Sequence, residues 1–163
     1  MKALIATVGG IGHLRPAPGT WASLVALPPG LALMWLAGPW GLVAATVLVF
    51  VAGLWAAPAV MAATGDDDPA QVVIDEVAGQ WIALWPLAFG AANAGASYLA
   101  LWPGWVAAFV LFRLFDIWKP GPVGWADRRG GVTGVMLDDV IAGVFAAIGV
   151  TLLAGLWHGV LMR

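Results

Sequence analysis

The stretch Gly41–Ala62, GLVAATVLVFVAGLWAAPAVMA, contains 22 residues and no charged side chain. A helix needs ~20 mostly apolar residues to cross the hydrocarbon core of a bilayer, so this segment is long enough to span it. The chain as a whole has 163 residues, of which 62% are hydrophobic and 10% are charged. This composition is typical of an integral membrane protein, and the length favours one domain covering residues 1–163.

Four further apolar segments lie on either side of this stretch and predict the rest of an all-α fold. They are residues 20–37, 69–89, 98–117 and 138–160. We therefore expect an integral membrane bundle of about four to five membrane-embedded helices. Thr20 and Asp68 are in position to cap two of these helices, because a side-chain oxygen there can accept a free backbone N–H.

Proline and glycine mark where the helices should bend and turn. Pro28-Pro29-Gly30 is expected to kink or break the first helix, because proline removes a backbone hydrogen bond and clashes with the preceding turn. Gly38-Pro39-Trp40 should form a short turn before the second helix, and residues 90–97 a tight return after the third. Residues 119–137 are rich in Gly and Pro and are expected to form one long loop.

Lysine and arginine residues near the ends of the spans predict the orientation of the bundle. Lys2 and Arg15 precede the first span. Lys119, Arg128 and Arg129 follow the fourth. Cytoplasmic loops carry the excess of these residues, so both groups should lie in the cytoplasm. With five spans, three polar stretches of the chain then meet at the cytoplasmic face, namely residues 9–20, 64–76 and 113–139.

The charged side chains are concentrated in two short windows. Thirteen of the sixteen fall within residues 66–76 and 113–139, and these windows hold all nine carboxylates. Ionisable groups are costly near a membrane and commonly belong to a functional site there. The absence of cysteine excludes a thiolate nucleophile and any Cys-ligated metal site. We expect a lipid bilayer around the protein and no nucleic-acid partner.

Five carboxylates are the main candidates for this site. Asp75 and Glu76 begin one predicted helix, Asp116 ends another, and Asp138 and Asp139 begin a third. Carboxylates within ~4–6 Å of one another repel unless a cation neutralises them, and a hard divalent ion such as Mg²⁺ is the usual partner. Alternatively, each carboxylate could complement a helix N-terminus, but this does not account for Asp116 at a C-terminal end.

The remaining polar residues near these carboxylates are open to more than one interpretation. Arg113, Asp116 and Lys119 recur every three residues, which suits either a structural salt-bridge ladder or phosphate recognition by the two cations. The glycine-rich loop of residues 9–20 is a weak additional candidate for anion binding. The run Asp66–Asp68 is instead expected to be a solvated loop.

Four motifs occur in order over nearly the whole chain. They are Pro18-Gly19-Thr20-x-x-Ser23, Val73-Ile74-Asp75-Glu76-x-x-Gly79, Phe112-Arg113-x-Phe115-Asp116-Ile117-x-Lys119-Pro120 and Gly134-Val135-Met136-x-Asp138-Asp139-x-x-Ala142-Gly143. In this combination the chain strongly resembles the phosphatidylglycerophosphatase A family. The resemblance implies a Mg²⁺-dependent lipid phosphatase of the bacterial inner membrane, which converts phosphatidylglycerophosphate to phosphatidylglycerol at the cytoplasmic face.

The resemblance also implies roles for individual residues. The acidic motif positions, taken as the catalytic set, are Asp75, Glu76, Asp116, Asp138 and Asp139. The expected metal ligands among them are Asp75, Glu76, Asp138 and Asp139. Asp116 either completes the metal site or activates water. The expected substrate-binding residues are Thr20, Ser23, Arg113 and Lys119, of which the two cations would hold phosphate oxygens.

Two details depart from the family pattern. Where the family usually has Gly-Thr-x-Gly-Ser, this chain has Gly19-Thr20-Trp21-Ala22-Ser23, which keeps the hydroxyl groups. The segment Gly130–Gly134 is one residue longer than the usual glycine spacing. His13 matches no motif position, and the roles of His13 and Arg15 stay open.

Two other classes of function suit parts of the sequence. A small cation-binding or ion-translocating membrane protein would also gather carboxylates, but it should carry them near the bilayer midplane, where the predicted helices are apolar. A non-catalytic assembly subunit would suit helices rich in Trp and Gly. The sequence does not indicate the oligomeric state.

Overall fold

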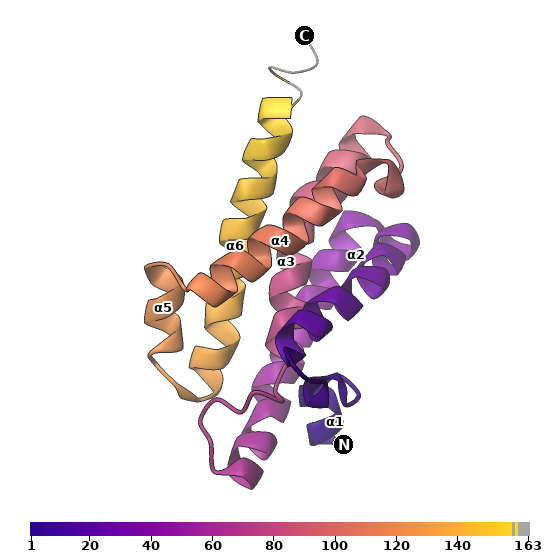
Figure 1. Ribbon diagram of the computed structural model, residues 1–163. Coiled ribbons are helices and arrows are strands. Elements are labelled where there is room, and N and C mark those ends of the chain that lie inside the picture. The colour runs from indigo at the N-terminus through magenta and orange to yellow at the C-terminus, as the bar shows by residue number, and fades with distance from the viewer. Residues whose placement is uncertain (158, 160–163) are drawn as a thin grey trace.

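The computed structural model of the chain describes residues 1–157 and 159. Every secondary-structure element in this described part is helical, which confirms the predicted all-α bundle (Figure 1). The elements are α1 (Lys2–Ala6), η1 (Ile11–His13), α2 (Pro18–Thr64), α3 (Ile74–Ala94), η2 (Tyr98–Leu101), α4 (Trp102–Trp118), α5 (Pro122–Asp127) and α6 (Gly131–Leu156). The predicted end of the last span at Val160 lies outside the described residues.

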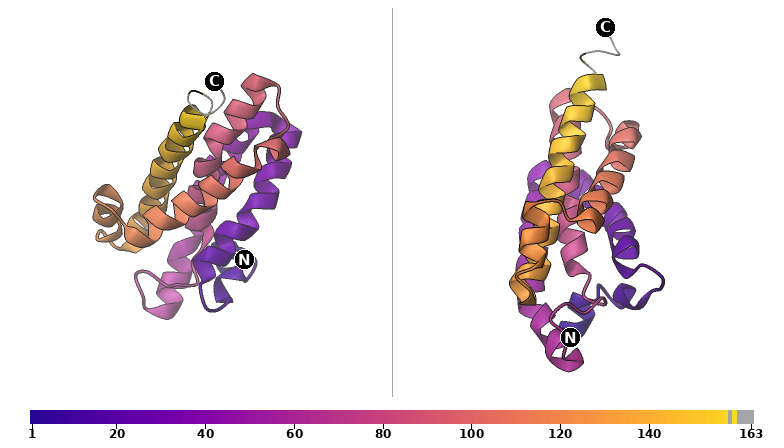
Figure 2. Two further views of the ribbon diagram at one scale, coloured as in Figure 1. Left: turned by 45° about the horizontal axis from the view of Figure 1, so that its top comes forward. Right: turned by 60° about the vertical axis from the view of Figure 1, so that its left-hand side comes forward.

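Helix α2 contains two of the predicted spans. Its backbone leaves helical geometry at Gly38, with φ 66° and ψ −168°. The two arms on either side of Gly38 run in opposite directions (Figures 1 and 2). Glycine suits this position because it has no Cβ to oppose a positive φ. The predicted turn between the first two spans is therefore confirmed at Gly38.

Pro28-Pro29-Gly30 was predicted to kink or break the first helix, and the break is wrong. The first arm of α2 continues through these residues in helical geometry. Helix α3 packs against this segment: the Trp81 Nε1 group donates a 2.8 Å hydrogen bond to the carbonyl oxygen of Ala26. Gly30 permits this close packing, because a Cβ there would lie 3.2 Å from the Trp81 indole nitrogen. Packing by neighbouring helices commonly makes proline tolerable in membrane helices.

The predicted starts of three helices are also wrong. Thr20 does not cap α2, which begins at Pro18 after Ala17. Asp68 does not cap α3, which begins at Ile74 rather than at residue 69. Helix α6 begins at Gly131, seven residues before Asp138. Consequently, the segment 119–137 is not one long loop, since it contains α5 and the first two turns of α6.

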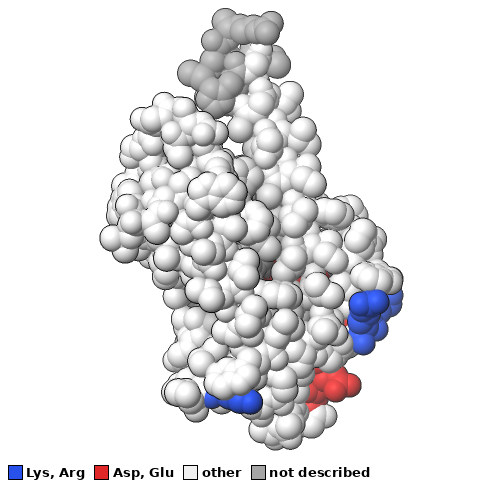
Figure 3. All heavy atoms as spheres, turned by 180° about the vertical axis from the view of Figure 1, so that it is seen from behind, with Lys and Arg blue, Asp and Glu red and all other residues white. Residues whose placement is uncertain are grey.

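Helix α3 lies at the centre of the bundle, and most of its side chains are buried. It packs against α2, α4 and α6. The surrounding helices expose large apolar side chains such as Leu48 (70% exposed) and Leu152 (63% exposed). Among the described residues, three helices are long and apolar enough to cross a membrane: α2, the segment Tyr98–Trp118 and α6. The face of the molecule seen in Figure 3 is uncharged over most of its area, with charges near the end opposite the C-terminus of α6.

Candidate active site

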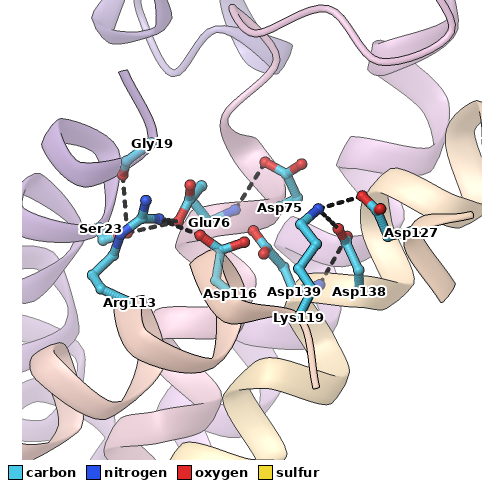
Figure 4. Close-up of polar contacts among 10 residues, drawn as sticks. All are labelled: Gly19, Ser23, Asp75, Glu76, Arg113, Asp116, Lys119, Asp127, Asp138 and Asp139. Carbon is cyan, nitrogen blue, oxygen red and sulfur yellow. Dashed lines mark hydrogen bonds and ion pairs between the residues drawn. The ribbon is translucent and has the colours of Figure 1, made fainter. Parts of the chain in front are cut away.

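The ends of several helices and the loop between α2 and α3 line a partly open, polar cavity of about 250 Å³. The N-terminal ends of α2 and α3, the C-terminal end of α4 and the first half of α6 contribute to its walls. Its charged lining residues are Asp68, Asp75, Glu76, Arg113, Asp116, Lys119, Asp138 and Asp139. The structure therefore brings all five predicted catalytic carboxylates together, along with both predicted phosphate-binding cations (Figure 4).

Helix α3 supplies two buried carboxylates from its first turn. The Asp75 Oδ1 atom accepts a 2.9 Å hydrogen bond from the backbone N–H of Glu76. The Glu76 Oε2 atom accepts a 2.8 Å hydrogen bond from the Ser23 hydroxyl of α2. The same oxygen accepts a hydrogen bond from Arg113 of α4. Glu76 is thus held by two other helices, whereas Asp75 forms no ion pair with any described cation.

Arg113 joins two carboxylates that would otherwise repel each other. Its Nη1 atom forms ion pairs with Glu76 and with Asp116 one turn further along α4, the second at 2.8 Å. The three side chains are all mostly buried, with exposed fractions between 11% and 14%. The Arg113–Asp116 half of the predicted ladder is therefore present. Lys119 does not continue it.

Lys119 turns away from α4 because it lies in the left-handed region of the backbone, with φ 49° at the C-cap of the helix. Its Nζ atom contacts Asp127 of α5 and lies 2.8 Å from the Asp138 Oδ2 atom of α6. Burial lowers the pKa of Lys119, but the hydrogen bonds to these two carboxylates outweigh burial and raise the pKa above its usual value. Lys119 therefore presents a positive charge at the cavity.

The position of Asp138 and Asp139 within α6 differs from the prediction. They are buried about two turns inside the helix, not at its start. The favourable charge of a helix N-terminus acts within the first turn, so it does not account for these two carboxylates. The alternative in which every carboxylate complements a helix N-terminus is therefore wrong for Asp138 and Asp139 as well as for Asp116.

Two glycines bring Asp139 close to α3. A Cβ at Gly143 would lie 2.5 Å from the Gly79 carbonyl oxygen, and a Cβ at Gly79 would lie 2.6 Å from the Asp139 carbonyl oxygen. The backbones of α3 and α6 are therefore nearly in contact, just beyond Glu76 and Asp139. Small residues permit such close approach between membrane helices.

Gly143→Ala should destabilise the protein by about 1–3 kcal/mol, because the added methyl group would push α6 away from α3. Thermal unfolding of the purified protein in detergent would measure this loss. Gly155→Ala is a matched control on the same helix, since a Cβ there meets nothing within 4 Å. Equal unfolding temperatures for the two variants would contradict the close contact between α3 and α6.

Three carboxylates are arranged to share one cation. Ligand oxygens of Glu76, Asp116 and Asp139 lie within 4.8 Å of one another, although they come from three different helices. Oxygen donors of this kind suit a hard divalent ion. The predicted metal set of Asp75, Glu76, Asp138 and Asp139 is brought into the same cavity, but the closest group contains Asp116 in place of Asp75 and Asp138.

The N-terminal end of α2 contacts this group directly. A Cβ at Gly19 would collide with the Glu76 carboxylate, so glycine is needed for this approach. Ser23 is buried and bonds Glu76, so it orients an acidic residue within the site. Thr20 is only partly buried and is not among the described residues that line the cavity. His13 and Arg15 are exposed and also lie outside the lining.

Comparison with known proteins identifies the family that has this arrangement of motifs. The family model of Phosphatidylglycerophosphatase A matches residues 4–154. The chain belongs to this family. Phosphatidylglycerophosphatase A of Haemophilus influenzae is 37% identical over 146 residues, covering 89% of this chain and 83% of the relative. The Escherichia coli protein of the same name is 36% identical over 148 residues, covering 88% of this chain and 78% of the relative.

A Bacteroides thetaiotaomicron relative, provisionally named phosphatidylinositol-3-phosphatase, is 40% identical over 157 residues, covering 91% of this chain and 90% of the relative. No solved structure matches the chain significantly. The names of these relatives therefore include two different lipid phosphates.

Sequence reasoning missed the place of two acidic residues of this chain. Asp68 is exposed in the loop before α3, as expected, but it also lines the cavity, which was not expected. Asp66 and Asp67 are exposed, as expected. Asp127 received no role, yet it contacts Lys119. Its only signal in the sequence was its place beside Arg128, in a segment that was expected to be a loop.

Proposed function

We propose that the protein is a Mg²⁺-dependent phosphatidylglycerophosphatase of the bacterial inner membrane. It would hydrolyse the terminal phosphate monoester of phosphatidylglycerophosphate to give phosphatidylglycerol and inorganic phosphate. One observation carries this proposal: six carboxylates and two cations line one cavity at one end of an apolar helical bundle, in a chain of this family. The acyl chains would stay in the bilayer while the phosphate enters the cavity from the cytoplasmic face.

Glu76, Asp116 and Asp139 are the proposed ligands of Mg²⁺. Their oxygens are close together and mostly buried, and Arg113 is the single cation that pairs with this group among the described residues. Three carboxylates and one guanidinium leave excess negative charge, which a divalent cation would balance. Bound Mg²⁺ would neutralise charge on the phosphoryl group as it is transferred.

The other charged residues of the cavity have complementary proposed roles. Arg113 and Lys119 would hold phosphate oxygens, because both are cationic and both line the cavity. Asp75 lines the cavity and forms no ion pair among the described residues, so we assign it to water activation. This assignment replaces Asp116, which lies within the proposed metal set.

The names of the relatives give two different lipid phosphates, so the substrate needs a direct test. The test measures phosphate release from three lipids in mixed micelles with Mg²⁺: phosphatidylglycerophosphate, phosphatidate and phosphatidylinositol 3-phosphate. The result would decide which of the two named substrates this protein prefers. We expect phosphatidylglycerophosphate to give the highest kcat/KM. A higher kcat/KM for phosphatidylinositol 3-phosphate would keep the reaction class but replace the substrate.

Ion translocation receives less support from the structure. The carboxylates that line the cavity gather around this single cavity, and the described residues include no further carboxylates along the length of α2, α3, α4 or α6. A transporter needs ionisable or polar groups near the midplane. Mg²⁺ flux into proteoliposomes without any lipid phosphate would overturn the enzymatic proposal, provided that the panel also showed no phosphate release.

A further inference from the structure

Among the described residues, Lys119 is the ion-pair partner of Asp127. Asp127 lies at the end of α5, is not among the described residues that line the cavity, and its side chain is 34% exposed. Its carboxylate and that of Asp138 both contact the single Nζ atom of Lys119 (Figure 4). Of these two carboxylates, the one from Asp138 is buried, with a side chain only 7% exposed. The Lys119 ammonium group therefore links the partly exposed carboxylate of Asp127 to the buried carboxylate of Asp138.

The chain around Lys119 fixes its backbone for this double contact. Lys119 has a positive φ of 49°, which is uncommon for a residue with a Cβ and implies that its surroundings hold it there. Its N–H donates a 2.9 Å hydrogen bond to the Phe115 carbonyl oxygen, which closes α4. A Cβ at Gly124 of α5 would lie 2.7 Å from the Lys119 carbonyl oxygen, so α5 packs directly on this residue.

The flexible part of Lys119 is its side chain, which Asp127 anchors from outside the cavity. Asp127 and Asp138 each accept one hydrogen bond from the ammonium group. An ammonium group has three donors, so Lys119 can keep its contact with Asp127 while its third donor binds a phosphate oxygen. Without Asp127, the long side chain would pair with Asp138 alone or leave the cavity.

We propose that Asp127 is a positioning residue that keeps the Lys119 ammonium at the cavity, where it can bind a substrate phosphate. This inference rests on the proposed phosphatase function. Its expected consequence is selective: substrate capture depends on Asp127, whereas the carboxylates that carry out hydrolysis remain in place.

Asp127→Asn should raise KM for the lipid phosphate by about tenfold and change kcat by less than about twofold, because one charge-assisted hydrogen bond to Lys119 is lost. Asp127→Glu should restore most of the wild-type KM, since it keeps the charge. Asp67→Asn is a matched control, because Asp67 is an exposed carboxylate outside the cavity lining. Thermal unfolding of each variant would show whether it folds.

A double-mutant cycle with Lys119→Gln separates positioning from a general structural role. If Asp127 acts through Lys119, the Asp127→Asn change should have no further effect on kcat/KM in the Lys119→Gln background. Additive losses, or an equal loss in kcat and KM without rescue by Asp127→Glu, would overturn the inference. Activity of the wild-type protein tests the phosphatase proposal separately: an inactive wild type refutes that proposal, whereas an active wild type with an unchanged Asp127→Asn variant refutes only this inference.

Discussion

Asp139→Asn should lower the rate of phosphate release by roughly 10³-fold, a loss comparable to that on removing a main electrostatic group from an active site. Asp139 is buried, and its carboxylate oxygen lies within 4.8 Å of ligand oxygens of Glu76 and Asp116. Asparagine keeps the shape but removes the charge that would hold a divalent cation. Phosphate release at increasing Mg²⁺ concentrations would measure the effect.

Two further variants test whether the effect on Mg²⁺ dependence is particular to the proposed metal ligands. Asp75→Asn should lower kcat without changing the Mg²⁺ concentration that gives half-maximal activity, because Asp75 lies outside the closest carboxylate group. Asp67→Asn should behave as the wild type. If Asp139→Asn keeps full activity, Asp139 is not a metal ligand. If Asp75→Asn shifts the Mg²⁺ dependence as Asp139→Asn does, then Asp75 binds the metal as well.

Arg113→Met should abolish measurable activity and destabilise the protein by about 3 kcal/mol, because it leaves two mostly buried carboxylates without their cation. The variant would also lose a donor for the substrate phosphate. Thermal unfolding and phosphate release, measured on the same preparation, would report both effects.

Arg113→Lys is the matched variant for this position. It keeps the charge, so most of the stability should return, but a single ammonium group does not reproduce the planar guanidinium. Activity should therefore stay at least roughly tenfold below that of the wild type. Wild-type stability in Arg113→Met would show that Arg113 does not hold Glu76 and Asp116 together.

The sequence was sufficient to predict the helical bundle and the residues that meet at one end of it. Long apolar segments predict helices because nothing else satisfies the backbone inside a bilayer. The alternation in direction of successive helices then places Asp75, Asp116 and Asp139 at the same end. Which carboxylates come within reach of a common ion depends on helix rotation and packing, and the Gly79–Gly143 contact is a pairing between helices that sequence spacing does not reveal.

The boundary errors have two physical causes. Gly130 and Gly131 suggested a loop, yet both have positive φ values that lead directly into α6. Pro28 and Pro29 suggested a break, yet packing by Trp81 of α3 keeps the helix continuous. Tertiary contacts therefore overrode the local preference of the two prolines, whereas the positive φ that glycine permits begins a helix at Gly130 and Gly131. The role of Asp127 was hidden because its partner Lys119 is reached only through the fold of α5.

Phosphate release from phosphatidylglycerophosphate by the purified protein, measured with Mg²⁺ and after chelation with EDTA, tests the central claim most directly. We expect release with Mg²⁺, loss of release with EDTA and recovery when Mg²⁺ is added back. The Asp139→Asn variant should stay at least roughly 10³-fold below the wild-type rate with Mg²⁺ in all three conditions. Undiminished release in EDTA would contradict a metal-dependent carboxylate site, and no release from any lipid phosphate with Mg²⁺ present would contradict the phosphatase function itself.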